Sequence, residues 1–509
     1  MGVQISPRAQ EVGGRTSFRS QRRKACGFNS RPQHFVRDAL RRRKYTMNSW
    51  IHKELSRKTI AIILGVLTLI NLGLHLYRAS YPAEPVFDEA HFSTYAADYA
   101  KNVAYFDIHP PLGKMIYGAA LVASGNPFAG SVEFVSFTVT STPGNEFKVD
   151  MAYRPDTYGK FPYILLRIIS SLFGLLLPLA FFVFLKTLKL SDITALLGAA
   201  FLVFDNALLL ETKLILMNGM YLTLGFIALA LYLEGKKHVA LAGVFLGLAF
   251  SVKLMTVSFL GVIVADLILA RMNKERVSRA IKFFFSAIAT LCVIYLLNFA
   301  VFPLADNINL ARKLLGAKDR ISIENFSALK KTLYGGAAFL QDIDAGLSGY
   351  LYGAKDHPLQ SSWYEWPIAK KSMLYFDSKE KTGNLVLVGN YAVWFLGSAA
   401  ALYAFLWLLA GFYKRYKQKG DILDGENIKI PFLLFAGYFA SLAPYFSAVN
   451  RSTFLYHYFP GLIFSVGLLC WLLEKKIKKP WQLAAVLLLV ILSFALEAGC
   501  TYGFSCPVL

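Results

Sequence analysis

The stretch PYILLRIISSLFGLLLPLAFFVFL, residues 162–185, contains one charged side chain, Arg167. A helix of about 20 apolar residues crosses the roughly 30 Å of hydrocarbon in a bilayer, so this stretch predicts a transmembrane helix. The whole chain has the same character, since 55% of its 509 residues are hydrophobic and 17% are charged. A soluble protein of this size would carry more charge and shorter apolar runs. The sequence therefore predicts a membrane protein.

Eleven apolar runs are long enough to be considered as membrane spans. They predict an all-α polytopic membrane protein with about eleven transmembrane helices. The fifth run is short and merges with the sixth. The runs lie near residues 59–79, 162–185, 193–210, 214–233, 238–252, 254–270, 280–303, 385–411, 430–448, 454–473 and 481–499.

Basic residues follow every second run, which sets the expected orientation because Lys and Arg collect in short cytoplasmic loops. The N-terminus is then cytoplasmic and the C-terminus external. Two large external loops follow, residues 80–161 and 304–384, and the segment 324–347 in the second predicts short interfacial helices. The expected location is the plasma (cytoplasmic) membrane. The net charge of +22 is explained by this topology, so no nucleic-acid partner is predicted.

Residues 1–46 differ from the rest of the chain because they are rich in Arg and Lys and lack hydrophobic periodicity. Two interpretations remain open: a basic, disordered cytoplasmic tail, or a start assigned too far upstream, with Met47 as the true first residue. Residues 47–509 are expected to form a single membrane domain.

The five cysteines lack the close spacing of a zinc site. Cys500 and Cys506 lie on the predicted external side, where either a disulfide or two free thiols would be compatible with the sequence. Phosphate-binding and dinucleotide-binding glycine motifs are also missing. No cofactor is predicted, although a pair of carboxylates is able to hold a divalent metal ion.

Charged residues are concentrated in VFDEAHFSTYAADYAKNVAYFDIHPPLGK, Val86 to Lys114, directly after the first run. Charges at a membrane face are costly and therefore indicate function. Asp88 and Glu89 are the candidate catalytic residues, and His109 and Lys114 are candidate substrate-binding residues. Two alternatives stay open. The carboxylates would also cap a helix beginning near Ala90, and the histidine would also suit a rigid turn before two prolines.

Solitary cations lie near the predicted external ends of other spans, namely Arg167, Lys213, Lys253 and Arg451. Such cations would together bind an anion such as a lipid phosphate. The alternative for each is a side chain that merely reaches the headgroups or forms a local ion pair. For Lys213 the sequence favours an ion pair with the neighbouring Glu211.

Three further residues are candidate substrate contacts. His457 lies between two tyrosines, and Trp363 and Trp366 lie in SSWYEWP. The histidine is equally compatible with a buried, hydrogen-bonded role. The tryptophans are equally compatible with an interfacial aromatic belt.

Four blocks resemble the protein O-mannosyltransferases, which are integral membrane enzymes of the glycosyltransferase C superfamily. The blocks are FDEAHF with FDIHPPLGK, LLRIISSLFG, HPLQSSWYEWPIAKKSMLYF with GNYAVWFLG, and RSTFLYHYFPGL, in this order over residues 86–465. The chain departs from the family pattern at Lys213 and Asn218, where members carry Arg and Asp. The second external loop is too short for the β-trefoil insertion of eukaryotic members, so the chain resembles a prokaryotic-type member.

The resemblance implies transfer of mannose from a polyprenyl-phosphate-linked donor to Ser or Thr hydroxyls of exported polypeptides at the external face. Asp88 would act as the general base and Glu89 would orient hydroxyl groups. Arg167, Lys114 and Arg451 would stabilise the departing phosphate. Direct attack on the anomeric carbon would invert its configuration.

Two other functions remain open. A related enzyme would move a sugar such as aminoarabinose from the same kind of lipid to a glycolipid. A transporter would place ionisable residues at mid-membrane and show repeat symmetry, and the sequence has neither feature. The oligomeric state is not predicted.

Overall fold

The computed structural model describes residues 50–506, apart from gaps at 104, 106, 126–133, 142–146, 154–156, 302–321, 323, 353–354, 356, 379–382 and 419–425. The expectations for residues 1–46 lie outside the described residues and stay predictions.

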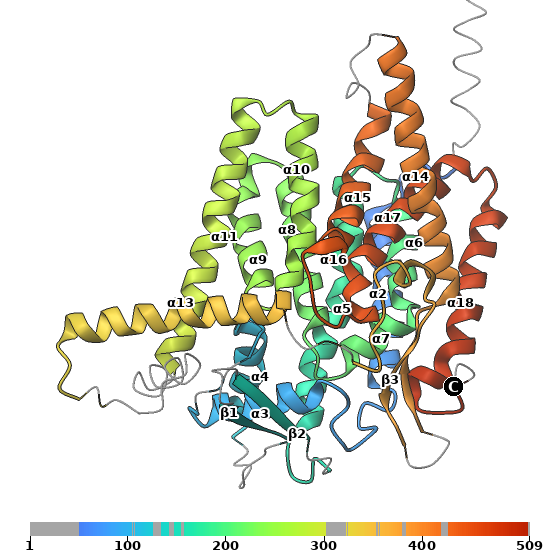
Figure 1. Cartoon of the computed structure of the whole chain (residues 1–509). Helices are drawn as coiled ribbons and strands as arrows, with labels where there is room; N and C mark the ends of the chain where they lie inside the picture. The colour runs from blue at the N-terminus through green and yellow to red at the C-terminus, as the bar shows by residue number, and fades with distance from the viewer. Residues whose placement is uncertain are drawn as a thin grey trace, which may run out of the picture. The chain divides into compact units, whose positions relative to one another are not determined.

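Within the described chain, seven helices are long and apolar enough to cross a membrane. The prediction of an all-α, polytopic membrane protein is thereby confirmed (Figure 1). The helices are α2 (Arg57–Leu76), α5 (Tyr163–Thr187), α11 (Lys274–Val301), α14 (Tyr391–Lys417), α15 (Glu426–Leu442, extended by the short α16, Pro444–Ser447), α17 (Phe459–Lys476, preceded by η4, Leu455–Tyr458) and α18 (Pro480–Tyr502).

The remaining apolar runs also form helices, but these are shorter or bent. The third run is split into α6 (Asp192–Val203) and α7 (Asn206–Lys213), which meet at 62°. Asp205 lies at the break and accepts a hydrogen bond from the backbone N–H of Leu208, which caps α7. The number of eleven spans stays a prediction. The other short elements are α8 (Asn218–Glu234), η1 (Lys236–His238), α9 (Val239–Phe250), η2 (Leu254–Phe259) and α10 (Leu260–Leu269).

Small residues allow two helices to approach closely. Gly243 and Gly247 form a GxxxG pattern on α9. A methyl group at Gly243 would overlap the carbonyl oxygen of Phe283 on α11, and one at Gly247 would overlap that of Ala287. Such small-residue faces are a common way to pack helices inside a bilayer, where no water drives association. The centre of the bundle is α17, of which 94% is buried, whereas only 11% of α2 is buried. The apolar side chains of α2 are thus left for lipid.

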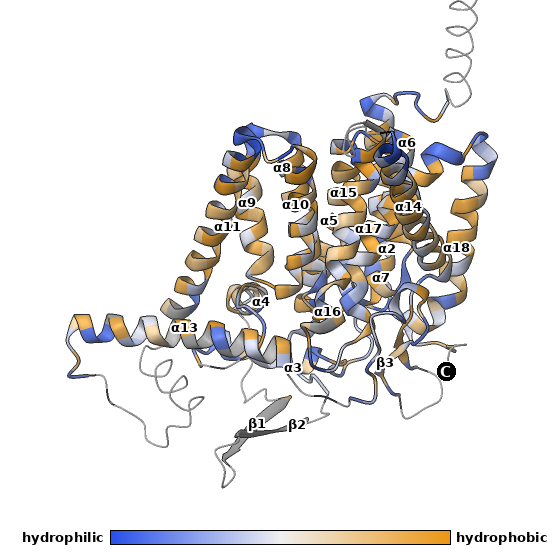
Figure 2. Cartoon of the chain, turned by 45° about the horizontal axis from the view of Figure 1, so that its top comes forward, coloured by the Kyte–Doolittle hydropathy of each residue, from blue (hydrophilic) through white to orange (hydrophobic). Residues whose placement is uncertain are grey.

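The connecting segments are sorted to the two ends of the helices. The basic turns that follow α5, α8, α10 and α17 lie at one end, together with the basic last turn of α14 (Figure 2). The opposite end carries the segments between spans: α3 (Glu89–Ala100), α4 (Leu112–Ala123), the hairpin β1 (Val135–Ser141)–β2 (Phe147–Tyr153), α13 (Ala328–Tyr352), η3 (Trp366–Ile368) and the pair β3 (Met373–Phe376)–β4 (Leu385–Leu387).

This sorting agrees with the alternation of basic loops, and we call the second end the site end. That the site end faces outward stays a prediction. α13 runs crosswise to α8 and α11 in both views, as an interfacial helix would, although it is longer than the short helices that were expected.

Two ties hold the segments at the site end. The backbone N–H of Ser361 donates to the carbonyl of Thr453 (2.8 Å), and the Thr453 hydroxyl donates back to the Ser361 carbonyl (2.7 Å). Cys500 and Cys506 form a disulfide, so the first of the two alternatives left by the sequence is present. These ties fix the second long loop and the C-terminal turn beside the helix ends.

Candidate active site

The acidic pair lies at the start of α3, at the site end. Phe87 has a left-handed backbone (φ 51°), and its ring stacks on that of Tyr375 with centroids 4.7 Å apart. Asp88 occupies the N-cap position, but its side chain makes no capping hydrogen bond. Within the described chain no hydrogen bond or ion pair engages its half-buried carboxylate. The capping alternative therefore lacks its main contact, and the carboxylate keeps its acceptor capacity for another molecule.

Glu89, in contrast, is buried and surrounded by donors. Its Oε1 accepts from Arg167 Nε (2.9 Å) and from the backbone N–H of Ile215 (2.7 Å). Its Oε2 accepts from Arg167 Nη2 (2.7 Å), from the backbone N–H of Val86 (3.0 Å) and from the hydroxyl of Tyr158 (3.2 Å). The carboxylate has no lone pair left for a sugar or acceptor hydroxyl.

The guanidinium of Arg167 is equally occupied. Besides the two bonds to Glu89, its Nη1 donates to the carbonyls of Ala79 (3.1 Å) and Pro82 (2.9 Å), and its Nη2 donates to that of Glu84 (3.5 Å). All five N–H donors of the guanidinium thus have partners. The structure gives Arg167 the task of holding the segment before α3, which differs from the phosphate contact expected from the sequence.

Lys114 also has protein partners. Its ammonium lies 2.7 Å from Asp107 Oδ2 and 2.5 Å from the carbonyl oxygen of His109, while His109 Nδ1 lies 3.1 Å from Asp107 Oδ1. Burial alone would raise the pKa of Asp107, but the charge of Lys114 and the imidazole of His109 outweigh it and hold that pKa well below its usual range. Burial lowers the pKa of His109. The sequence analysis missed Asp107, although it lies within the quoted FDIHPPLGK.

Lys253 is a buried cation with unused donors. Its ammonium donates to Asn218 Oδ1 (2.8 Å) and lies 4.9 Å from the centre of the Tyr456 ring. No other hydrogen bond engages it in the described structure, so two of its three N–H groups have no acceptor. Among the candidates, Lys253 is best placed for an anionic ligand.

The expected ion pair between Lys213 and Glu211 is wrong. Lys213 donates to the carbonyl of Tyr77 (2.8 Å) and lies 4.3 Å from the centre of the Tyr502 ring. Glu211 instead accepts hydrogen bonds from Asn218 and Tyr375. Residues two positions apart on a helix face different directions, which explains the separation.

The remaining candidates form an aromatic wall. Trp366 is fully buried, donates from Nε1 to Ser361 Oγ (3.0 Å) and stacks on His457 (5.9 Å). His457 is buried and is hydrogen bonded through Nδ1 to the backbone of Phe454. Trp363 is half-buried and packs on Phe446. These residues form an apolar side of the site, since the polar atoms of Trp366 and His457 that form hydrogen bonds do so within the protein.

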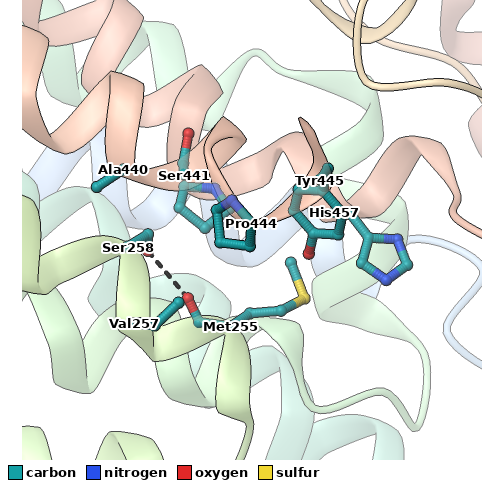
Figure 3. Close-up of a pocket in the computed structure, with 9 residues that line it drawn as sticks. Met255, Val257, Ser258, Ala440, Ser441, Pro444, Tyr445 and His457 are labelled. Carbon is teal, nitrogen blue, oxygen red and sulfur yellow. Dashed lines mark hydrogen bonds between the residues drawn. The ribbon is translucent and has the colours of Figure 1, made fainter. Parts of the chain in front are cut away.

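A small pocket lies beside His457, between η2, α15–α16 and α17 (Figure 3). Most of its lining is apolar, and the hydroxyl of Ser258 is turned to the carbonyl of Met255 (3.0 Å). The lining residues are Met255, Val257, Ser258, Ala440, Ser441, Pro444, Tyr445, His457 and Pro460.

Three charged residues, Asp88, Glu211 and Arg451, lie close enough to Lys253 to change its pKa. Burial lowers the pKa of Lys253, Glu211 and Asp88 oppose this, and Arg451 adds to it. The structure thus brings together residues that are distant in sequence from the first loop, the α9–η2 turn and the loop before η4. In the described chain, no three His, Cys, Asp or Glu residues cluster closely enough to hold a metal ion.

Two family models match most of the chain. Residues 65–310 match the model described as "Dolichyl-phosphate-mannose-protein mannosyltransferase", and residues 343–508 match the "C-terminal four TMM region of protein-O-mannosyltransferase". The chain belongs to the protein O-mannosyltransferase family. The candidate residues predicted from the sequence, from Asp88 to His457, all lie inside the two matched ranges.

Curated relatives resemble a part of the chain. Protein O-mannosyltransferase 1 of Drosophila pseudoobscura pseudoobscura is 29% identical over 223 residues, which is 42% of this chain and 22% of the relative. Dolichyl-phosphate-mannose–protein mannosyltransferase 1 of Saccharomyces cerevisiae is 29% identical over 224 residues, which is 41% of this chain and 25% of the relative. The match thus spans a quarter or less of the length of these relatives.

Solved structures share the fold. The S. cerevisiae protein O-mannosyltransferase Pmt1–Pmt2 complex bound to the sugar donor aligns with a TM-score of 0.71 at 13% identity, covering 89% of this chain and 91% of that one. The Archaeoglobus fulgidus oligosaccharyltransferase aligns with a TM-score of 0.50 at 12% identity, covering 90% and 56%. These solved structures therefore share the arrangement of helices over most of this chain.

Proposed function

We propose that this member of the family transfers mannose from a polyprenyl-phosphate-linked donor to Ser or Thr hydroxyls of exported polypeptides. One observation carries the proposal: a carboxylate without a protein partner, Asp88, lies near a buried ammonium with two unused donors, Lys253. The relatives and the structural neighbour described above are named as mannosyltransferases that act on proteins. This chemistry needs a base and a phosphate-binding cation, and Asp88 and Lys253 are the residues that we propose for these two roles.

In the proposed reaction, Asp88 accepts the proton of the acceptor hydroxyl while the hydroxyl oxygen attacks the anomeric carbon of mannose. The bond between that carbon and the phosphate oxygen breaks, and its electron pair leaves with the phosphate. A single displacement of this kind inverts the anomeric configuration. Lys253 and Arg451 stabilise the charge that grows on the phosphate.

The other charged candidates take supporting roles in this proposal. Glu89 and Arg167 hold the backbone before α3, and with it the position of Asp88. Lys114, Asp107 and His109 fix the start of α4 in the same way. The small apolar pocket beside His457 begins two residues after Lys253, at Met255.

The site is proposed to open at the external face of the plasma membrane. The basic turns lie at the end of the helices opposite to the site, and such turns are usually cytoplasmic. Acceptors would then be polypeptides that have already crossed the membrane.

The test is incubation of the purified full chain with radiolabelled polyprenyl-phosphate mannose and a Ser/Thr-rich peptide. Label in the peptide is the expected result. Label in an added glycolipid acceptor instead of the peptide would favour the glycolipid transferase. No label in either acceptor would overturn the proposal, provided that donor binding by the same preparation is demonstrated.

A further inference from the structure

A chain of hydrogen bonds connects four buried side chains at the site end. Tyr375 on β3 donates from its hydroxyl to Glu211 Oε1, and Asn218 Nδ2 donates to Glu211 Oε2 (2.7 Å). Lys253 Nζ in turn donates to Asn218 Oδ1 (2.8 Å). The four residues come from β3, α7, α8 and the α9–η2 turn, and each is at most 5% exposed.

The order of donors in this chain is fixed by chemistry. A carboxylate only accepts and an ammonium only donates, so the Asn218 amide must face Glu211 with its NH₂ group and Lys253 with its oxygen. When Glu211 is ionised, its negative charge polarises the amide toward the ammonium. Hydrogen bonds in such a buried chain strengthen one another.

The same carboxylate is connected to Asp88 through aromatic packing. Tyr375, which is bound to Glu211, stacks on Phe87, and Phe87 directly precedes Asp88. Phe87 has a left-handed backbone, a conformation that needs support from its surroundings. Glu211 thus lies between the proposed base and the proposed phosphate ligand, while it touches neither.

We infer that Glu211 is a positioning residue which, through Asn218, holds Lys253 charged and aimed at the donor phosphate. This inference rests on the proposed function. It assigns a role to a carboxylate that the sequence had suggested as the partner of Lys213, and it explains what supports the charge of a buried lysine.

Charges around Lys253 support this role. Burial lowers the pKa of Lys253, whereas the carboxylates of Glu211, Asp88 and Asp107 raise it. Arg451, on the segment before η4, lowers it. Loss of Glu211 would therefore remove one of the negative charges that keep the ammonium protonated, and the site would lose its cation at a lower pH.

The experiment measures donor KM and kcat over a range of pH for wild type and Glu211→Gln. We expect the variant to raise donor KM about tenfold, with a smaller change in kcat, since a charged contact to phosphate is weakened. We also expect the alkaline limb of kcat/KM to move about one unit to lower pH. Adding Asn218→Asp to Glu211→Gln should restore the limb, because it places a carboxylate directly on Lys253.

Glu497→Gln is the matched control, because this buried carboxylate lies on α18, outside the hydrogen-bond chain of Lys253, with Cys500 Sγ 3.9 Å away and Tyr391 nearby. It should leave the pH profile unchanged.

Inactive wild type would overturn the proposed function itself. This inference alone would be overturned if the wild type is active and Glu211→Gln has the same donor KM and the same alkaline limb of kcat/KM as the wild type. If Glu211→Gln does not accumulate, Asn218→Ala removes the amide instead, and an unchanged donor KM in that variant would likewise overturn the inference.

Discussion

Arg167 and Glu89 form an enclosed ion pair with two contacts, in which Nε lies 2.9 Å from Oε1 and Nη2 lies 2.7 Å from Oε2. Neither side chain is more than 1% exposed. The pair joins the second turn of α5 to the first turn of α3, and so connects a membrane span to the segment that carries Asp88.

Removing one member of this pair should destabilise the protein more than it affects donor recognition. Glu89→Gln leaves the guanidinium buried without its counter-charge, and breaking such a pair costs about 3–5 kcal/mol. We expect a clear loss of thermal stability in detergent and low accumulation in membranes. A variant of normal stability with weakened donor binding would return Arg167 to the phosphate-binding role that the sequence suggested.

A different outcome is expected for Arg451. It lies beside the site and is half-buried, and its Nε donates to the Ser452 carbonyl over 3.4 Å. Arg451→Ala should weaken donor binding about tenfold or more while the protein still folds, because charged hydrogen bonds to phosphate are strong. Arg451→Lys should rescue binding in part, since the planar fork is lost. Equal donor affinity in all three proteins would leave Arg451 without a role in donor binding.

The contrast between these two arginines shows how far the sequence predicts the site. The sequence predicted both arginines as candidates because each is a solitary cation near the end of a span, and it predicted Asp88 from the acidic motif. Whether a cation is already paired depends on groups far away in sequence: Glu89 receives a bond from Ile215, 126 positions later. Glu211 was misassigned for the same reason, because its partner Tyr375 is 164 positions away. Apolar runs predicted the helices well, since hydropathy is a local property, whereas the bend at Asp205 was not predicted.

The orientation is testable with two single-cysteine variants in a background without the native free thiols. Lys355→Cys lies in the second predicted external loop, and Lys417→Cys lies at the last residue of α14, at the end opposite to the site. An impermeant thiol reagent should label the first in intact cells and the second only after lysis. Labelling of Lys417→Cys in intact cells would reverse the topology and the proposed external site.

Stability should also depend on the protonation of His109. Its pKa is lowered from 6.5 in the folded protein, chiefly by burial, while Asp107 opposes the shift and Lys253 and Lys114 add to it. The unfolded chain therefore binds the proton more readily, and stability that is present above the unfolded pKa is lost as the pH falls through it. Thermal unfolding of wild type and His109→Gln between about pH 8 and pH 5 should show a stability difference that shrinks toward acid. A constant difference would mean that His109 does not titrate in this way.

The most decisive variant is Asp88→Asn. It keeps the shape of the side chain but cannot take the proton of an acceptor hydroxyl, and general-base catalysis contributes about 10²- to 10⁴-fold. We expect turnover to fall by that order while thermal stability and donor binding stay near wild type, since the carboxylate makes no bond to the protein in the described structure.

Helix capping would give the opposite result, because Asn caps a helix about as well as Asp and would leave turnover intact. Donor affinity and melting temperature, measured in the same preparation, serve as the controls. If Asp88→Asn transfers mannose at the wild-type rate, Asp88 is not the base. Glu89 would be a poor replacement, since both of its oxygens are already bonded by Arg167 and by backbone N–H groups, and the proton acceptor would then have to come from the substrate or from water.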